Sequence, residues 1–243
     1  MIYLAIGRRE RGKTTWTYHH AHELPTRVIV DPRRQIEPRA DVLVAMTSDE
    51  VEQAFDRVLQ HNPAHGSPPR EILIVPGDNP QAVFDTLCAD ERRWIELDDT
   101  RKLAVVIDEA RFVDQNTPAC SWILRCSPRG AVHIFFSAHR PSDLSTNVRA
   151  IADYWIMFHM TQEHDLKVVS EHCGSDVAER VRALRQFHYI EWNDGASTMM
   201  LHDKPARWKI ALRSRRSMTD VSQDSVIDEG RVVGQVNLFR REG

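Results

Sequence analysis

A glycine-rich loop near the N-terminus has the residue types needed to bind phosphate groups. Residues 7–14, Gly-Arg-Arg-Glu-Arg-Gly-Lys-Thr, match the pattern G-x-x-x-x-G-K-[ST]. Glycines let the backbone wrap with its N–H groups aimed at phosphate oxygens, and a helix starting near Lys13 adds the positive end of its dipole. Lys13 would span the β- and γ-phosphates of a nucleoside triphosphate, and Thr14 would coordinate Mg²⁺. The alternative is a chance match in an ordinary strand–turn–helix. The predicted triphosphate-binding residues are Gly7, Arg8, Arg9, Glu10, Arg11, Gly12, Lys13, Thr14 and Thr15.

Two adjacent carboxylates, Asp108 and Glu109, follow an apolar run at residues 103–107. Successive side chains of a strand point to opposite faces, so the two carboxylates differ in direction. Asp108 would reach the water shell of the magnesium ion, and Glu109 would act as the catalytic residue that polarises the attacking water. Alone, the pair is better explained as a strand ending in solvated acids. Together with the glycine-rich loop, it favours triphosphate hydrolysis.

A third strand-like run ends in polar residues at Ser137 and His139, ahead of Pro141, which can open a helix at its first turn. In a parallel sheet, a strand beside the Asp108–Glu109 strand delivers its carboxyl end to the same crevice. We expect His139 or Ser137 to contact the γ-phosphate or the attacking water. A strand end with an exposed histidine is the alternative.

Apolar runs of strand length alternate with helical patterns along most of the chain. The runs are continuous, as in strands buried on both faces of a parallel sheet. The alternation predicts an α/β fold with a doubly wound, mainly parallel sheet. We expect strands at residues 2–6, 28–30, 42–46, 72–75, 103–107, 132–137 and 154–158. We expect helices at residues 14–24, 48–60 with Ser48 as N-cap, 80–94, 117–126, 163–173 and 176–184.

The C-terminal part of the chain has a different pattern. Residues 187–192 and 198–201, joined through Asn193-Asp194-Gly195, predict a hairpin. We expect one ATPase domain over residues 1–213 and a flexible arm over residues 214–243, where hydrophobic density falls. A dense basic run could neutralise DNA phosphates, although a solvated basic face is an equal alternative. The run contains Lys204, Arg207, Lys209, Arg213, Arg215 and Arg216.

The composition sets broad limits on the protein class. The 243 residues, 42% of them hydrophobic, suit one large domain. A net charge of −3 does not exclude DNA binding, because a ring can keep its basic residues in a pore. No stretch approaches the ~20 apolar residues of a membrane span. The four cysteines lack CxxC spacing, which favours reduced thiols in the cytoplasm.

The order of these motifs resembles the HerA–FtsK superfamily of DNA-pumping ATPases. The resemblance rests on the glycine-rich loop, on Val30-Asp31-Pro32, on residues 106–110 and on residues 137–144, and it covers roughly residues 1–192. Family members typically carry glutamine, as γ-phosphate sensor, where this chain has His139. That departure resembles the small viral genome-packaging ATPases of the superfamily. The resemblance implies a P-loop NTPase fold (RecA-like, ASCE class), with a mainly parallel sheet flanked by helices and a C-terminal hairpin.

The same resemblance implies cofactors and partners. The protein would use ATP and Mg²⁺, held by Thr14 and Asp108, and form a homo-oligomeric ring, either hexamer or pentamer. An arginine from the neighbouring subunit would complete catalysis. Arg129 matches the family position best, followed by Arg125 and Arg149. The other partners would be double-stranded DNA and a viral capsid portal or vertex protein, in the host cytoplasm or on the virion. The leading interpretation is an ATP-driven DNA translocase that packages a viral genome.

Three other interpretations stay open. A cellular HerA-like or conjugation-type DNA-pumping ATPase is the first, although a membrane span and an extra N-terminal domain are not visible. The second is a P-loop kinase or GTPase-like switch, but neither a lid nor an Asn-Lys-x-Asp base motif is visible. The third is an assembly protein with a relic phosphate loop, against which the intact Lys13, Thr14, Asp108 and Glu109 argue.

Overall fold

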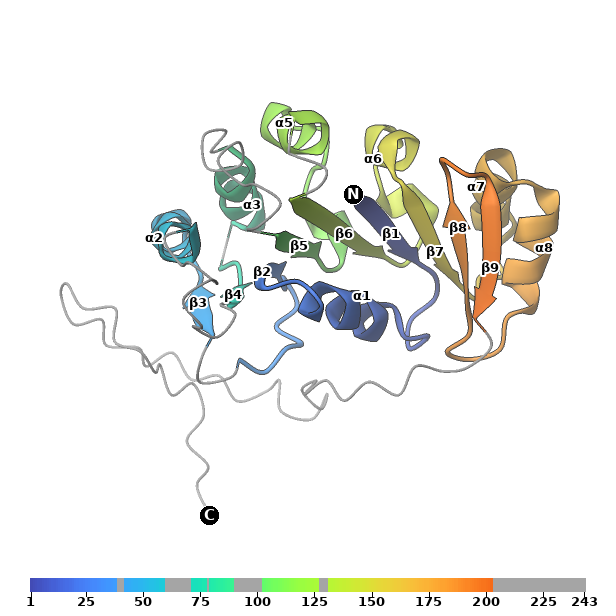
Figure 1. The fold of residues 1–243 in the computed structure, drawn as a ribbon, viewed down its shortest axis with the longest axis horizontal. Helices are drawn as coiled ribbons and strands as arrows, with labels where there is room; N and C mark the ends of the chain where they lie inside the picture. The colour runs from blue at the N-terminus through green and yellow to red at the C-terminus, as the bar shows by residue number, and fades with distance from the viewer. Residues whose placement is uncertain (39–41, 60–70, 78, 90–101, 127–130, 203–243) are drawn as a thin grey trace, which may run out of the picture.

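A single mixed sheet forms the centre of the protein. The computed structural model describes residues 1–38, 42–59, 71–77, 79–89, 102–126 and 131–202. In these residues nine strands follow the order β3-β4-β2-β5-β6-β1-β7-β8-β9, in which β1 to β7 are parallel and β8 and β9 are antiparallel (Figure 1). The strands are β1 (Ile2–Ile6), β2 (Thr26–Val30), β3 (Leu43–Ala45), β4 (Glu71–Ile74), β5 (Leu103–Ile107), β6 (Val132–Ala138), β7 (Tyr154–Phe158), β8 (Tyr189–Asn193) and β9 (Thr198–His202).

The central strands are parallel and buried, which explains their continuous apolar sequences. Every residue of β2, β4 and β5 is buried. Strand β6 lies directly between β1 and β5, with Ile134 paired to both Ile2 and Val105. The carboxyl ends of these three strands therefore meet at one edge of the sheet, where the glycine-rich loop, the carboxylate pair and His139 follow them.

Helices cover the two faces of the sheet unequally. Helix α1 (Lys13–His22) packs on one face, and the other helices lie on the opposite face (Figure 1). Two separate apolar cores result, one on each face. The opposite-face helices are α2 (Ser48–Leu59), α3 (Pro80–Ala89), α5 (Pro118–Cys126), α6 (Thr146–Ile151), α7 (Glu163–Cys173) and α8 (Ser175–Ala183).

The start of α2 corrects one sequence-based prediction. Ser48 was expected to cap this helix, but the hydrogen bonds place the cap at Thr47. The Glu50 N–H donates to Thr47 Oγ1 at 3.3 Å, and the Thr47 N–H donates to Glu50 Oε2 at 3.1 Å. This reciprocal pair is a capping box, which satisfies two N–H groups that the helix itself leaves free. A hydroxyl at Ser48 has no corresponding glutamate three residues later, since that position is Val51.

The first strand of the hairpin begins two residues later than predicted. Strand β8 starts at Tyr189, because Phe187 has φ 65° and lies in a turn closed by a hydrogen bond from the His188 N–H to the Arg185 carbonyl. The predicted end of the third helix at residues 90–94 lies outside the described residues. So do the boundary at residue 213, the arm at residues 214–243 and the basic run beginning at Lys204. Within the described part of the chain, no helix is long and apolar enough to cross a membrane.

Candidate active site

The glycine-rich loop leaves the sheet through a position that admits no side chain. Gly7 has φ 144°, and a Cβ atom there would lie 2.7 Å from Phe158 Cβ and 2.9 Å from the Phe158 carbonyl oxygen. The Gly7 N–H donates to the Ala138 carbonyl at 3.3 Å, and the Arg8 N–H donates to the His159 carbonyl at 3.2 Å. The loop is thus fixed to the ends of both neighbouring strands before Gly12, at φ 103°, opens α1.

The amine of Lys13 crosses the inside of this loop. Lys13 is 6% exposed, and its Nζ donates to the Arg8 carbonyl at 3.0 Å and lies 3.2 Å from His139 Nδ1. Burial lowers the pKa of Lys13 to about 8, although Glu109 and Asp108 oppose the change. An ammonium group held by one carbonyl and one imidazole still has hydrogen-bonding capacity for phosphate oxygens.

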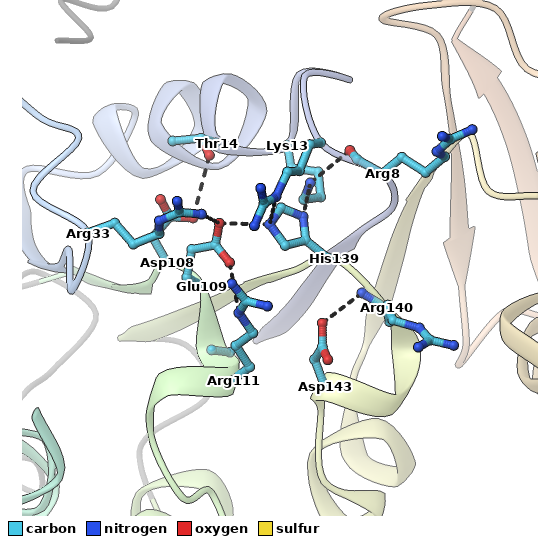
Figure 2. A network of polar contacts seen from close by, with 12 residues as sticks. Arg8, Lys13, Thr14, Arg33, Asp108, Glu109, Arg111, His139, Arg140 and Asp143 are labelled. Carbon is cyan, nitrogen blue, oxygen red and sulfur yellow. Dashed lines mark hydrogen bonds and ion pairs between the residues drawn. The ribbon is translucent and has the colours of Figure 1, made fainter. Parts of the chain in front are cut away.

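His139 connects Lys13 to the carboxylate of Glu109. His139 Nε2 lies 2.8 Å from Glu109 Oε1, on the side of the ring away from Lys13 (Figure 2). An ammonium can only donate, so His139 Nδ1 must accept from Lys13, which leaves Nε2 to carry the hydrogen that points to Glu109. Arg9 Nε lies 3.4 Å from the same Nε2. In this tautomer Arg9 contributes charge near the ring but no hydrogen bond to it.

Glu109 is surrounded by cationic and hydrogen-bonding groups. Arg33 donates to Oε1 at 3.2 Å, and Arg111 Nε lies 3.5 Å from Oε2 (Figure 2). Burial alone would raise the pKa of Glu109, but the contacts with His139 and Arg33 outweigh it and lower the pKa to about 2. The backbone of Glu109 is also left-handed, at φ 49° and ψ 53°, a strained conformation that is common at functional sites. The structure therefore holds an ionised, strained carboxylate next to the phosphate loop.

Asp108 has a different environment from its neighbour. Its Oδ1 lies 3.5 Å from Thr14 Oγ1, and its Oδ2 is buried with no hydrogen-bond partner among the described residues. Burial raises the pKa of Asp108 to about 6, with Ser137 opposing and Asp31 and Glu109 adding to the rise. A buried oxygen without a partner beside a hydroxyl fits Mg²⁺, which prefers oxygen ligands and takes several from phosphates and water. Thr14 and Asp108 are thus suited to hold that ion.

The buried charge of Asp108 leads to a prediction about stability. Its pKa is raised from 3.8 to about 6, so the stability contributed by its protonated form is complete below pH 3.8 and is lost as the pH rises through 6. This shift corresponds to a cost on the order of 3 kcal/mol at pH 8. We expect Asp108→Asn, in EDTA without nucleotide, to raise the Tm at pH 8 by roughly 6–12 °C. The gain should shrink at pH 5. A lower Tm than that of the wild type at pH 8 would contradict this account.

Several residues at the site were not predicted from the sequence. Arg33 follows Asp31, whose buried carboxylate accepts the N–H groups of Arg33 and Ile36 and so shapes the loop after β2. Gln115 is buried and joins the segments that follow β5 and β6: its Nε2 donates to the carbonyls of Ala110 and Asp143, and its Oε1 accepts from the Ser145 N–H. Arg33 reaches the site because it follows β2, the strand that pairs with β5, and this pairing leaves no signal in the sequence.

Arg8, Arg125 and Arg149 lie in different parts of the structure. Arg8 directs its side chain away from the cluster, while its carbonyl accepts from Lys13 (Figure 2). Arg125 is exposed near the end of α5, and in the described part of the chain no contact joins it to His139 or Glu109. Arg149 lies on α6 and bonds Thr146. Arg129 lies outside the described residues.

Comparisons with known proteins show similarity in structure. No protein-family model matches the sequence, and no curated protein matches it. The genome packaging NTPase B204 from Sulfolobus turreted icosahedral virus 2, solved with AMPPCP, matches with a TM-score of 0.63 at 20% identity, over 84% of this chain and 97% of that chain. The DNA-packaging ATPase B204 from Sulfolobus turreted icosahedral virus matches with a TM-score of 0.61 at 21% identity, over 84% and 97%.

A second kind of protein shares the fold. The bacterial conjugative coupling protein TrwBdeltaN70 matches with a TM-score of 0.57 at 10% identity, over 88% of this chain and 86% of that chain. At such identities the similarity establishes the fold. The predicted α/β P-loop ATPase fold, with a mainly parallel sheet and a C-terminal antiparallel hairpin, is confirmed. The structural similarity to packaging and coupling ATPases that the sequence resemblance implied is confirmed as well.

Proposed function

We propose that this protein hydrolyses ATP with Mg²⁺ and uses the reaction to move double-stranded DNA, as the genome-packaging motor subunit of a virus. The main support is the continuous chain of contacts from Lys13 through His139 to Glu109 at the phosphate loop, with 3.2 Å and 2.8 Å between the partners. These three residues lie in a fold that is shared with proteins described as a genome packaging NTPase and a DNA-packaging ATPase.

Each residue of the cluster has a part in the proposed reaction. Backbone N–H groups of residues 7–15 and the Lys13 amine bind the triphosphate. Thr14 and Asp108 hold Mg²⁺, which when bound neutralises charge on the phosphates. Glu109 accepts a hydrogen bond from the attacking water and orients it. Since the pKa of Glu109 is about 2, orientation is a larger part of this role than proton abstraction.

His139 is the proposed sensor of the γ-phosphate. Its ring lies between the amine that binds the phosphate and the carboxylate that orients the water. When a γ-phosphate takes over the hydrogen bonds of Lys13, the Nδ1 atom of His139 loses its donor, and one of the two contacts that orient the ring towards Glu109 is lost. Occupancy of the phosphate site is thereby linked to the orientation of Glu109.

The catalytic cluster is proposed to be completed in a ring of five or six copies. A transferring phosphoryl group needs positive charge on its outer side, and a trans-acting arginine supplies it in many NTPases. Arg129 is the first candidate for this role, and the exposed Arg125 is the second. The ring would act in the host cytoplasm or on the virion, docked to a capsid portal or vertex protein.

Stimulation of the ATPase rate by duplex DNA would distinguish the proposed translocase from an ATPase that does not act on DNA. We expect duplex DNA to raise the ATPase rate severalfold at about 50 mM salt, and the effect to decline towards 200 mM as counterions compete for the phosphates. A variant with alanine at Lys204, Arg207 and Lys209 should keep its basal rate and lose part of the stimulation. Basal hydrolysis with no response to DNA at low salt would rule out translocation and leave the ATPase assignment standing.

A conjugation-type DNA pump is the second candidate, favoured by the similarity to TrwBdeltaN70 over 86% of its chain. Both candidates predict stimulation by DNA. They differ in the docking partner, which is a capsid protein for the packaging motor. Nuclease-protected DNA in capsids that depends on this protein would support packaging, and normal DNA-filled capsids without it would favour the second candidate.

A further inference from the structure

An aromatic ring lies against the phosphate loop on the side away from Glu109. Phe187 is 44% exposed, on the turn between α8 and β8. It is the third residue of a turn closed by the hydrogen bond from the His188 N–H to the Arg185 carbonyl, at 3.2 Å, and its φ is 65°. Glycine or asparagine is favoured at such a position, because an L side chain strains the left-handed backbone. The side chain of Phe187 therefore strains the backbone of the turn, which is unfavourable for folding.

The Phe187 ring lies next to the glycine that opens α1. A Cβ atom built on Gly12 would lie 3.4 Å from Phe187 Cδ1 and 3.5 Å from Phe158 Cε1, so the ring borders the residue that opens α1. The loop itself is anchored to the end of β7, because the His159 carbonyl accepts the N–H of Arg8 at 3.2 Å. Phe187 therefore lies beside a loop that is fixed to the neighbouring strand.

The strand order places Phe187 and the His139–Glu109 pair on opposite sides of the loop. His139 and Glu109 follow β6 and β5, on one side of β1, whereas Phe187 precedes β8, which lies beyond β7 on the other side (Figure 1). A triphosphate whose γ-phosphate meets Lys13 and His139 must extend its nucleoside away from them. The half-exposed ring of Phe187 lies on that opposite side of the loop.

We propose that Phe187 is the platform on which the nucleobase of the bound nucleotide stacks, an inference that rests on the proposed triphosphate site. Every base has an apolar π-face, so a phenylalanine ring binds it without reading its hydrogen-bonding groups. The platform therefore accepts both purine bases, and ATP and GTP should bind with similar affinity. The phosphate loop supplies the remaining affinity and is independent of the ring.

The test compares ATP with inorganic triphosphate, which has no base. In Phe187→Gly the affinity for ATP, measured by calorimetry, should fall about tenfold while the affinity for inorganic triphosphate stays unchanged. The Tm of this variant should not fall, because glycine tolerates a φ of 65°. Phe187→Tyr, which keeps the π-face, should bind ATP like the wild type. Met200→Ala, at a 59% exposed residue of β9, is the matched apolar control.

Two results would contradict the proposal that the nucleobase stacks on Phe187. Unchanged ATP affinity in Phe187→Gly would show that the base does not touch the ring. An equal loss for both ligands would show that Phe187 only shapes the phosphate loop. Failure of the proposed function looks different, because a wild-type protein that binds neither ATP nor inorganic triphosphate has no triphosphate site, and the platform falls with it.

Discussion

Replacing Lys13 with alanine is expected to lower kcat/KM for ATP by about 10³-fold, the effect of removing a preorganised charged donor from a reaction centre. The Lys13 amine is buried, crosses the loop from the Arg8 carbonyl to His139, and is the cation at the position where a γ-phosphate would lie. Without it, the charge that develops on the phosphoryl group has no fixed partner inside the loop. Phosphate release at saturating and subsaturating ATP measures the loss.

A matched lysine makes this experiment specific. Lys167 on α7 is 73% exposed and pairs only weakly with Glu171 at 3.8 Å, so Lys167→Ala should hydrolyse ATP like the wild type. Thermal unfolding of Lys13→Ala checks that the loop still folds. A folded Lys13→Ala variant with wild-type turnover would remove the phosphate role of Lys13, and with it the proposed ATPase.

The central strands and the phosphate loop were predictable because their signals are local. Strands at residues 2–6, 103–107 and 154–158 have the predicted bounds, since strands buried on both faces leave continuous apolar runs. The loop motif is a contiguous stretch, and its position between a strand and a helix was readable directly. The cap of α2 also has a local signal, because Thr47 and Glu50 have capping-box spacing, which the neighbouring Ser48 lacks.

Contacts that depend on strand order could not be predicted in the same way. Arg33 meets Glu109 because β2 pairs with β5, although 76 residues separate the two in the chain. Phe187 meets Gly12 because β8 returns beside β7. Neither pairing leaves a local pattern, so an arginine after a strand and a phenylalanine in a turn look like ordinary surface residues in the sequence.

The structure separates two carboxylates that the sequence presents as equals. Burial raises the pKa of Asp108 to about 6, whereas His139 and Arg33 lower the pKa of Glu109 to about 2 despite its burial. Adjacent groups whose environments push their pKa values apart commonly have different catalytic roles. Asp108 is the group whose charge a bound cation would stabilise, and Glu109 stays ionised without one. Under the proposed function, Glu109 would therefore be the residue available to the attacking water.

Glu109→Gln tests this division directly. Glutamine keeps the size of the side chain and can accept one hydrogen bond, but it loses the charge that orients and polarises the water, so kcat should fall by about 10²–10⁴-fold. ATP affinity should change little, because Lys13 and the loop N–H groups bind the phosphates. Single-turnover hydrolysis and ATP binding by calorimetry separate the two effects, with Glu179→Gln on the exposed face of α8 as control. A variant that hydrolyses ATP normally would show that water is activated elsewhere. A variant that no longer binds ATP would show instead that Glu109 supports the loop through His139.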